Sequence, residues 1–158
     1  MQHVFAGSEQ GKGNRFYLMG LDGAPPKPIS GEGIDALQFA ISPDGHVVAG
    51  IGPDGKGYLY PTAGGDPHPI SGFEKGEVPI SWTADGKGLF LTRPGERPAR
   101  VMRLDVTTGQ RMPWKELMPL DNAGVQNIGP IRLTPDGKSY VYGFQRRLSD
   151  LYLVEGLK

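Results

Sequence analysis

Histidine and aspartate are two residue types of this chain that could bind a metal ion. The three histidines are His3, His46 and His68. None of them has a second ligand at the spacing found in zinc sites, so a structural or exposed role is favoured. The aspartates of interest, each followed by glycine, are Asp44, Asp85 and Asp136. They lack the alternating oxygen ligands and the following glutamate of a calcium loop, so we predict turn stabilisation and no bound metal or cofactor.

Nucleophilic catalysis needs a different set of residues, which this sequence does not contain. There is no cysteine, and no Gly-x-Ser-x-Gly motif to place a serine on a sharp strand-to-helix turn. The Gly-rich loop, the His-Arg-Asp motif and the Asp-Phe-Gly motif of protein kinases are absent as well. We therefore predict that this chain is not an enzyme.

Positive charge gathers in one part of the chain, where a partner could bind. The arginines there are Arg93, Arg97, Arg100, Arg103 and Arg111. Alternating residues on the solvated face of strands explain most of them, although arginine is also enriched at protein interfaces. Trp114 follows between two prolines, and a tryptophan on a loop is a common interface anchor. The candidate partner-binding residues are Trp114, Arg93, Arg97, Arg100 and Arg103, with Trp114 covering the end of a sheet as the alternative.

A repeated hairpin must position these residues. It reads Phe-Ala-Ile-Ser-Pro-Asp-Gly-His-Val-Val-Ala-Gly at 39–50, and similar runs return at 80–91 and 131–142. Each turn combines Ser or Thr, Pro or Ala, Asp and Gly, the residue types that tight turns select. Before the turn, apolar residues such as Ile80 and Trp82 alternate, which predicts one buried face for each first strand. Each copy is expected to be a strand, a tight turn and a strand.

The spacing of the copies predicts the architecture. Asp44 and Asp85 lie 41 residues apart, and Asp136 follows 51 residues later. A second landmark has the same period, because the Tyr-Leu pair at 17–18 recurs at 58–59. Strand-rich repeats of about 40–45 residues are typical of β-propeller blades with four antiparallel strands. We predict an all-β fold, a partial β-propeller with about two full and two incomplete blades.

The predicted domain is a single propeller fragment over residues 1–158. Its blade segments are about 1–31, 36–72, 78–112 and 127–158, with an insertion at about 113–126. Within the insertion, the stretch from Pro113 to Pro119 alone has helical character, and its flanking prolines limit it to about one turn. The strands expected in the last segment are 128–133, 138–144 and 150–154.

Both ends of the chain indicate a piece of a larger ring. The run at 3–7 matches the run at 46–50, which is the strand after the turn, so an inner strand and its turn are expected to precede it. No outer strand follows the last segment. Because a propeller closes by joining its first and last blades, we expect that Met1 is not the native start of the fold. The alternative is a homo-oligomer in which two copies pair through their open blade edges.

Composition excludes several classes of partner. Lysine plus arginine and aspartate plus glutamate number 17 each, and the net charge of zero gives no long-range attraction for nucleic acid or an anionic membrane. No apolar run approaches the roughly 18 residues of a membrane helix, and the opening residues show no signal-peptide pattern. We expect no nucleic-acid binding and no membrane insertion, and a protein or peptide as partner.

The repeats resemble those of a known bacterial family. The runs Ile-Ser-Pro-Asp-Gly at 41–45, Gly-Tyr-Leu-Tyr at 57–60 and Pro-Ile-Ser at 69–71 are similar to the TolB-type, WD40-like (PD40) propeller repeat. The run 134–158 also resembles the C-terminal end of propellers in membrane-bound bacterial signalling proteins linked to Ser/Thr kinases. The resemblance implies a non-catalytic scaffold that interacts with proteins or peptides, in an extracytoplasmic (periplasmic) location.

Two alternatives stay open beside the scaffold. The chain could be the sensor propeller of a bacterial transmembrane Ser/Thr kinase, or the propeller lid of a prolyl-oligopeptidase-like hydrolase. In both cases the catalytic domain would lie outside this chain, because none of its residues matches the catalytic motifs.

Overall fold

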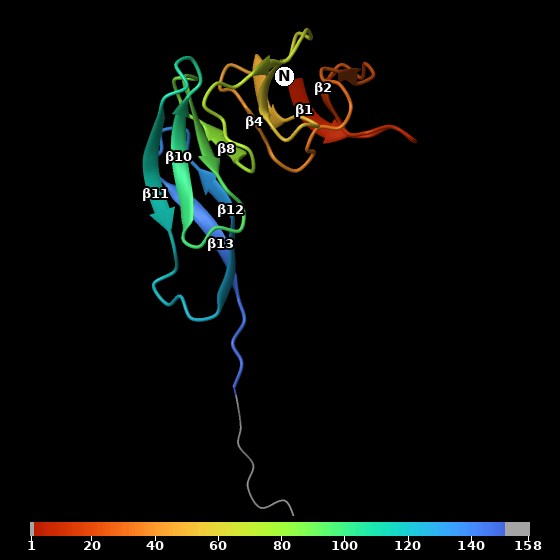
Figure 1. Cartoon of the computed structure of the whole chain (residues 1–158). Helices are drawn as coiled ribbons and strands as arrows, with labels where there is room; N and C mark the ends of the chain where they lie inside the picture. The colour runs from red at the N-terminus through yellow and green to blue at the C-terminus, as the bar shows by residue number, and fades with distance from the viewer. Residues whose placement is uncertain (1, 151–158) are drawn as a thin grey trace, which may run out of the picture.

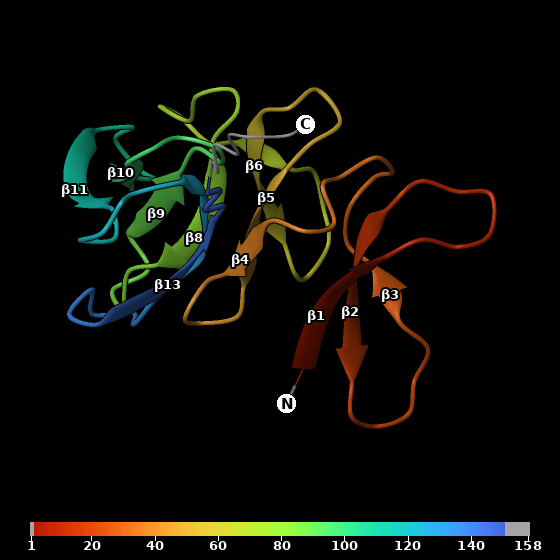
Figure 2. The same ribbon diagram turned by 90° about the horizontal axis from the view of Figure 1, so that it is seen from below.

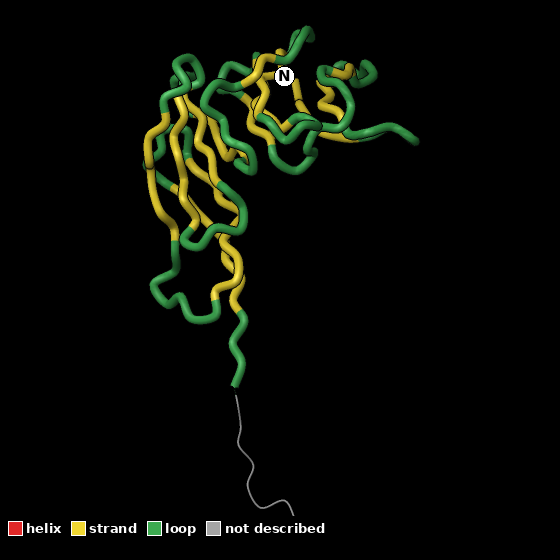
Figure 3. Tube along the Cα trace, in the orientation of Figure 1, coloured by secondary structure: helices red, strands yellow, loops and turns green. Residues whose placement is uncertain are grey.

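The computed structural model describes residues 2–150, and all regular structure in that range is β-strand (Figure 3). The strands are β1 (Gln2–Gly7), β2 (Arg15–Gly20), β3 (Lys27–Pro28), β4 (Phe39–Ile41), β5 (Val47–Ile51), β6 (Gly57–Pro61), β7 (His68–Pro69), β8 (Val78–Trp82), β9 (Gly88–Thr92), β10 (Ala99–Asp105), β11 (Arg111–Leu117), β12 (Val125–Leu133) and β13 (Tyr140–Arg146). Within this range no helix has the length and apolarity that crossing a membrane requires.

The strands form four antiparallel sheets that follow one another along the chain (Figure 1). Two have four strands, β4 to β7 and β8 to β11; one has three, β1 to β3; and β12 pairs with β13. Figure 2 shows the sheets standing side by side as blades. The first strands β4, β8 and β12 contact one another in sequence, so they form the inner side of the stack. The predicted all-β, partial propeller fold is confirmed.

The three repeated hairpins occupy equivalent places. The pairs of residues that flank the turns are Ile41 with Val48, Trp82 with Leu89, and Leu133 with Tyr140. In each hairpin the two partners lie seven residues apart, and each pair joins the first strand of a sheet to the second. The 41- and 51-residue offsets seen in the sequence are therefore offsets between structurally equivalent units.

Each turn is held by its own side chains. In the first copy the Ser42 hydroxyl donates to Asp44 Oδ1 at 2.5 Å, and the same oxygen accepts the backbone N–H of His46 at 3.0 Å. Gly45 takes φ +74°, a conformation that glycine adopts without strain. The turns around Thr83 and Thr134 repeat these bonds. The hydroxyl bond, and then the backbone N–H bond, lower the pKa of each turn aspartate below its usual value.

These lowered pKa values predict a loss of stability in acid. A carboxyl whose pKa is lower in the folded than in the unfolded chain stabilises the fold above its unfolded pKa of about 3.9, and the contribution disappears as the pH falls toward the folded pKa. The melting temperature should therefore fall between about pH 5 and pH 3. Calorimetry at a series of pH values measures this, with the triple variant Asp44→Asn, Asp85→Asn, Asp136→Asn as control. An equal acid loss in the triple variant would contradict the assignment.

The core lies between successive sheets. Phe16, Val48 and Tyr60 pack between the first two sheets. Trp82 and Leu89 pack against the preceding sheet through a second cluster. The third cluster, between the last two sheets, consists of Phe90, Ala99, Val101, Leu117, Val125, Ile128 and Ile131. Each blade is thus stabilised by apolar contacts with its neighbours in the chain.

The prediction of a helical turn between Pro113 and Pro119 is wrong. β11 runs as a strand through Leu117, so the predicted insertion at 113–126 begins later than expected. Proline is tolerated there because β11 is an edge strand and its register shifts opposite Val101 and Met102, which leaves Trp114 as the extra residue of a bulge. The other segment boundaries stay a prediction.

The last sheet is described only in part. The strands expected at 128–133 and 138–144 correspond to β12 and β13. The strand expected at 150–154 falls, except for Asp150, outside the described residues.

Candidate functional site: the inner-strand pocket

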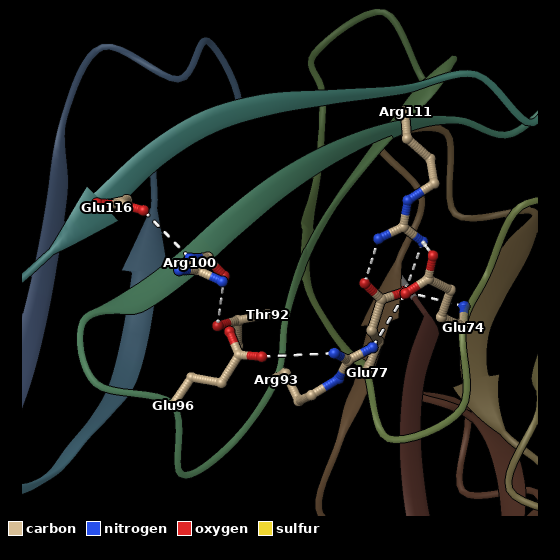
Figure 4. Close-up of polar contacts among 8 residues, drawn as sticks. All are labelled: Glu74, Glu77, Thr92, Arg93, Glu96, Arg100, Arg111 and Glu116. Atoms are coloured by element: carbon tan, nitrogen blue, oxygen red, sulfur yellow. Dashed lines mark hydrogen bonds and ion pairs between the residues drawn. The ribbon is translucent and has the colours of Figure 1, made fainter.

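The structure separates the arginines that the sequence groups together. Arg93 forms ion pairs with Glu74 at 3.0 Å and with Glu96 at 3.4 Å (Figure 4). Arg111 also contacts Glu74 and holds the buried Glu77 through both of its terminal nitrogens. Arg93 and Arg111 thus belong to one polar network at the start of the third blade, balanced by carboxylates.

The remaining arginines have separate partners. Arg100 pairs with Glu116 at 3.1 Å across the outer strands. Arg103 lies 4.0 Å from a carboxylate oxygen of Asp85. Arg97 donates from Nη1 to the backbone oxygen of Val125 at 3.1 Å. Each of the four predicted arginines thus has a partner within the described residues, and their role in partner binding stays a prediction.

Trp114 packs between blades. Its ring lies 5.3 Å from that of Phe90 and 5.7 Å from that of Tyr140, both edge-on. The ammonium group of Lys115 covers the Tyr140 ring at 4.4 Å. Trp114 is half-buried, so the contacts correspond to the alternative in which it covers the end of a sheet. A role in partner binding stays a prediction.

A cavity of about 350 Å³ lies at the inner side of three consecutive blades. We name it the inner-strand pocket; its lining residues are Leu37, Gln38, Val78, Pro79, Ile80, Thr92, Arg93, Pro94, Asn127, Ile128, Gly129, Pro130, Ile131 and Arg132. Gln38, Pro79 and Pro130 are separated by the same 41 and 51 residues as the turns. Each of the three blades therefore contributes the equivalent stretch, which lies on the first strand in β8 and β12 and just before it at β4.

The inner-strand pocket combines positive charge with free backbone. Among the described residues, two arginines line it and no carboxylate does. Arg132 is exposed and donates to the backbone oxygen of Ile131 at 2.9 Å, and among residues 2–150 it forms no ion pair. Within residues 2–150, β8 and β12 each pair on one side only, with β9 and β13. The pocket can therefore offer backbone donors and acceptors beside the guanidinium group of Arg132, whereas that of Arg93 is already paired with Glu74 and Glu96.

The described part of the chain offers no metal-binding geometry. It contains no group of three or more His, Cys, Asp or Glu side chains that could hold a metal ion. His3, His46 and His68 are exposed.

Comparison with known proteins concerns the fold. No family model and no curated protein matches the chain. Among solved structures, TolB from Acinetobacter baumannii matches 91% of this chain with a TM-score of 0.60 and 19% identity. A putative TolB from Agrobacterium tumefaciens matches 90% with a TM-score of 0.56 and 20% identity. The chain has a TolB-like β-propeller fold.

The TolB-like propeller described here is shorter than its neighbours. It spans 40% of the first TolB chain and 53% of the second. An oligogalacturonate lyase in complex with manganese has a similar fold, with a TM-score of 0.57 and 15% identity; 89% of this chain and 48% of that chain are covered. At these identities the likeness concerns the fold alone.

Sequence reasoning missed Arg132 in this TolB-like repeat. It occupies the place of Ala40 and Ser81 in the two preceding blades, so aligning the three repeats would have marked it as a charged residue on an inner strand. Of the five predicted partner-binding residues, Arg93 alone lines the inner-strand pocket.

Proposed function

We propose that this TolB-like propeller is a non-catalytic scaffold that binds an acidic, extended segment of a protein or peptide in the inner-strand pocket. The observation that carries the proposal is a cavity lined, within residues 2–150, by two arginines and no carboxylate, beside the unpaired edges of β8 and β12. An extended peptide can pair its backbone with a free strand edge. Carboxylates on that peptide would be bound through charge-assisted hydrogen bonds by the guanidinium group of Arg132, since Arg93 is already paired with Glu74 and Glu96.

Peptide selection tests this proposal. We expect a random peptide library selected on the parent chain to yield acidic sequences. Arg132→Glu should weaken their binding by about tenfold or more, because it places a like charge beside the ligand. Arg100→Glu is the matched control, since it makes the same charge change at an exposed position outside the pocket.

The two variants give distinct outcomes. Retained binding in Arg100→Glu with loss in Arg132→Glu supports the pocket. Equal losses in both variants, or selected peptides without acidic residues, would contradict it.

The family resemblance adds an extracytoplasmic location to the proposal. The sensor of a transmembrane kinase and the lid of a hydrolase stay predictions, since they depend on domains outside this chain. Pairing of two copies through open blade edges also stays a prediction. It is supported by Val141 on β13, which is 66% exposed, whereas its equivalents Ala49 and Phe90 are buried between blades.

A further inference from the structure

A second cavity, of about 400 Å³, has the opposite chemistry and lies at the first two blades. We name it the tyrosine pocket; its lining residues are Gly31, Glu32, Ile34, Pro53, Asp54, Tyr58, Tyr60 and Pro67. It shares no residue with the inner-strand pocket. A ligand of the tyrosine pocket would therefore bind independently of the acidic segment proposed above.

Two tyrosines of β6 give the pocket its aromatic lining. Tyr58 and Tyr60 are two residues apart on the strand and therefore point to the same face. Their ring centroids are 6.2 Å apart, with the planes inclined by 53°. Tyr60 is 3% exposed, and Phe16 packs edge-on behind it at 5.2 Å. Tyr60 is therefore the buried floor of the pocket, and the half-buried Tyr58 provides the ring that a ligand can reach.

The charge at the tyrosine pocket is negative. Its ionisable residues besides the tyrosines are Glu32 and Asp54, and within the described range no lysine or arginine lines it. The Tyr58 hydroxyl donates to Asp54 Oδ2 at 2.9 Å, which fixes the ring beside the carboxylate. Burial first, and then the nearby Tyr58 and Asp54, raise the pKa of Tyr60 to about 12, so this ring stays neutral at physiological pH.

Two basic side chains lie near the tyrosine pocket without lining it. Arg15 pairs with Glu32 at 2.6 Å, and the ammonium group of Lys56 lies 3.7 Å from Asp54. The lysine side chain is 71% exposed, and exposed ion pairs of this kind contribute little free energy. Asp54 stays a source of negative charge at the pocket, although its two oxygens also accept hydrogen bonds from the Lys56 amide and the Tyr58 hydroxyl.

We propose that the tyrosine pocket binds a small organic cation of the quaternary or alkylated ammonium class. Aromatic rings attract such cations through the negative potential of their faces, and the attraction is strongest for cations with weakly held water. The proline and isoleucine side chains provide contact surface for the alkyl groups, and Asp54 provides the opposite charge. A bare metal ion does not fit this description, because it requires several oxygen ligands.

The test uses the full chain and two probes of nearly the same shape. Choline carries the quaternary charge, and 3,3-dimethylbutan-1-ol replaces its nitrogen by carbon and is neutral. Binding is followed by ligand-observed and protein-observed NMR. We expect choline to bind about tenfold or more tightly than the alcohol and to shift the amide signals of β6. Equal binding of the two probes, or no binding of either, would overturn the proposal.

Variants locate the site. Tyr58→Leu removes a ring but keeps apolar volume, and Asp54→Asn removes the charge but keeps an oxygen for the turn bond to the Lys56 amide. Each should weaken choline binding about fivefold or more, while the already weak binding of the alcohol changes little in Asp54→Asn. Asp22→Asn is the control, because Asp22 caps a similar exposed turn outside the pocket. Unchanged choline affinity in both pocket variants would refute the assignment.

Discussion

Trp82→Ala is expected to lower the free energy of unfolding by about 3–5 kcal/mol. The Trp82 side chain is 4% exposed and packs among Ala40, Leu89 and Leu91 between the second and third blades. Its Nε1 donates to the backbone oxygen of Ala40 at 2.9 Å. The substitution leaves a cavity and also removes a buried hydrogen bond to the neighbouring blade.

Denaturant unfolding followed by circular dichroism measures this loss. Trp82→Phe serves as the control, because it keeps an aromatic ring in the cavity and loses mainly the hydrogen bond. Its cost should be clearly smaller than that of Trp82→Ala. If the alanine variant unfolds like the parent, the assignment of Trp82 to the core between the second and third blades is wrong.

Arg111→Met is expected to destabilise the chain by about 3 kcal/mol or more, because it leaves Glu77 buried without its partner. The Glu77 side chain is 5% exposed. Its Oε2 accepts from Arg111 Nη1 at 2.9 Å and from the backbone N–H of Glu74 at 2.9 Å. Arg111 also donates to the backbone oxygen of Gly72 at 2.6 Å, which ties β11 to the loop that opens the third blade.

A pair of controls makes the second prediction specific. Arg100→Met removes an arginine that is 64% exposed in its pair with Glu116, and should change stability by about 0.5 kcal/mol or less. The double variant Arg111→Met, Glu77→Met should recover much of the loss, because it removes the unpaired charge. Thermal and denaturant unfolding of all three variants measures these differences. Equal stability of Arg111→Met and Arg100→Met would contradict the prediction.

The fold could be predicted because the hydrogen bonds that define its repeated turns join residues close together in sequence. The Ser42 turn and its two copies hold themselves together within six residues, so the sequence pattern is also the structure. The expected single buried face of Ile80 and Trp82 is wrong, because Ile80 is the extra residue of a bulge opposite β9. Trp82 packs between the second and third sheets, and Ile80 packs between the third and fourth. The stretch at 113–119 misled because its prolines exclude an interior strand, whereas the structure places them on an edge strand with a bulge.

The candidate site could be predicted much less well. Several partners of the arginines are distant in sequence: Glu77 precedes Arg111 by 34 residues, and Glu116 follows Arg100 by 16. Nothing local tells a paired arginine from a free one. Arg132 and the two tyrosines of β6 gain their significance from residues of neighbouring blades, and this becomes visible only when the blades are placed side by side.

The blade-to-blade core has a consequence for how the molecule comes apart. Within residues 2–150, each sheet packs only against the sheets before and after it, so stability behaves nearly as a sum of unit and nearest-neighbour terms along one dimension. A substitution in the core between two sheets, such as one at Trp82, should therefore destabilise mainly the two sheets that this core joins. We expect this chain to unfold in several steps, in which neighbouring sheets separate one after another, rather than in a single cooperative transition.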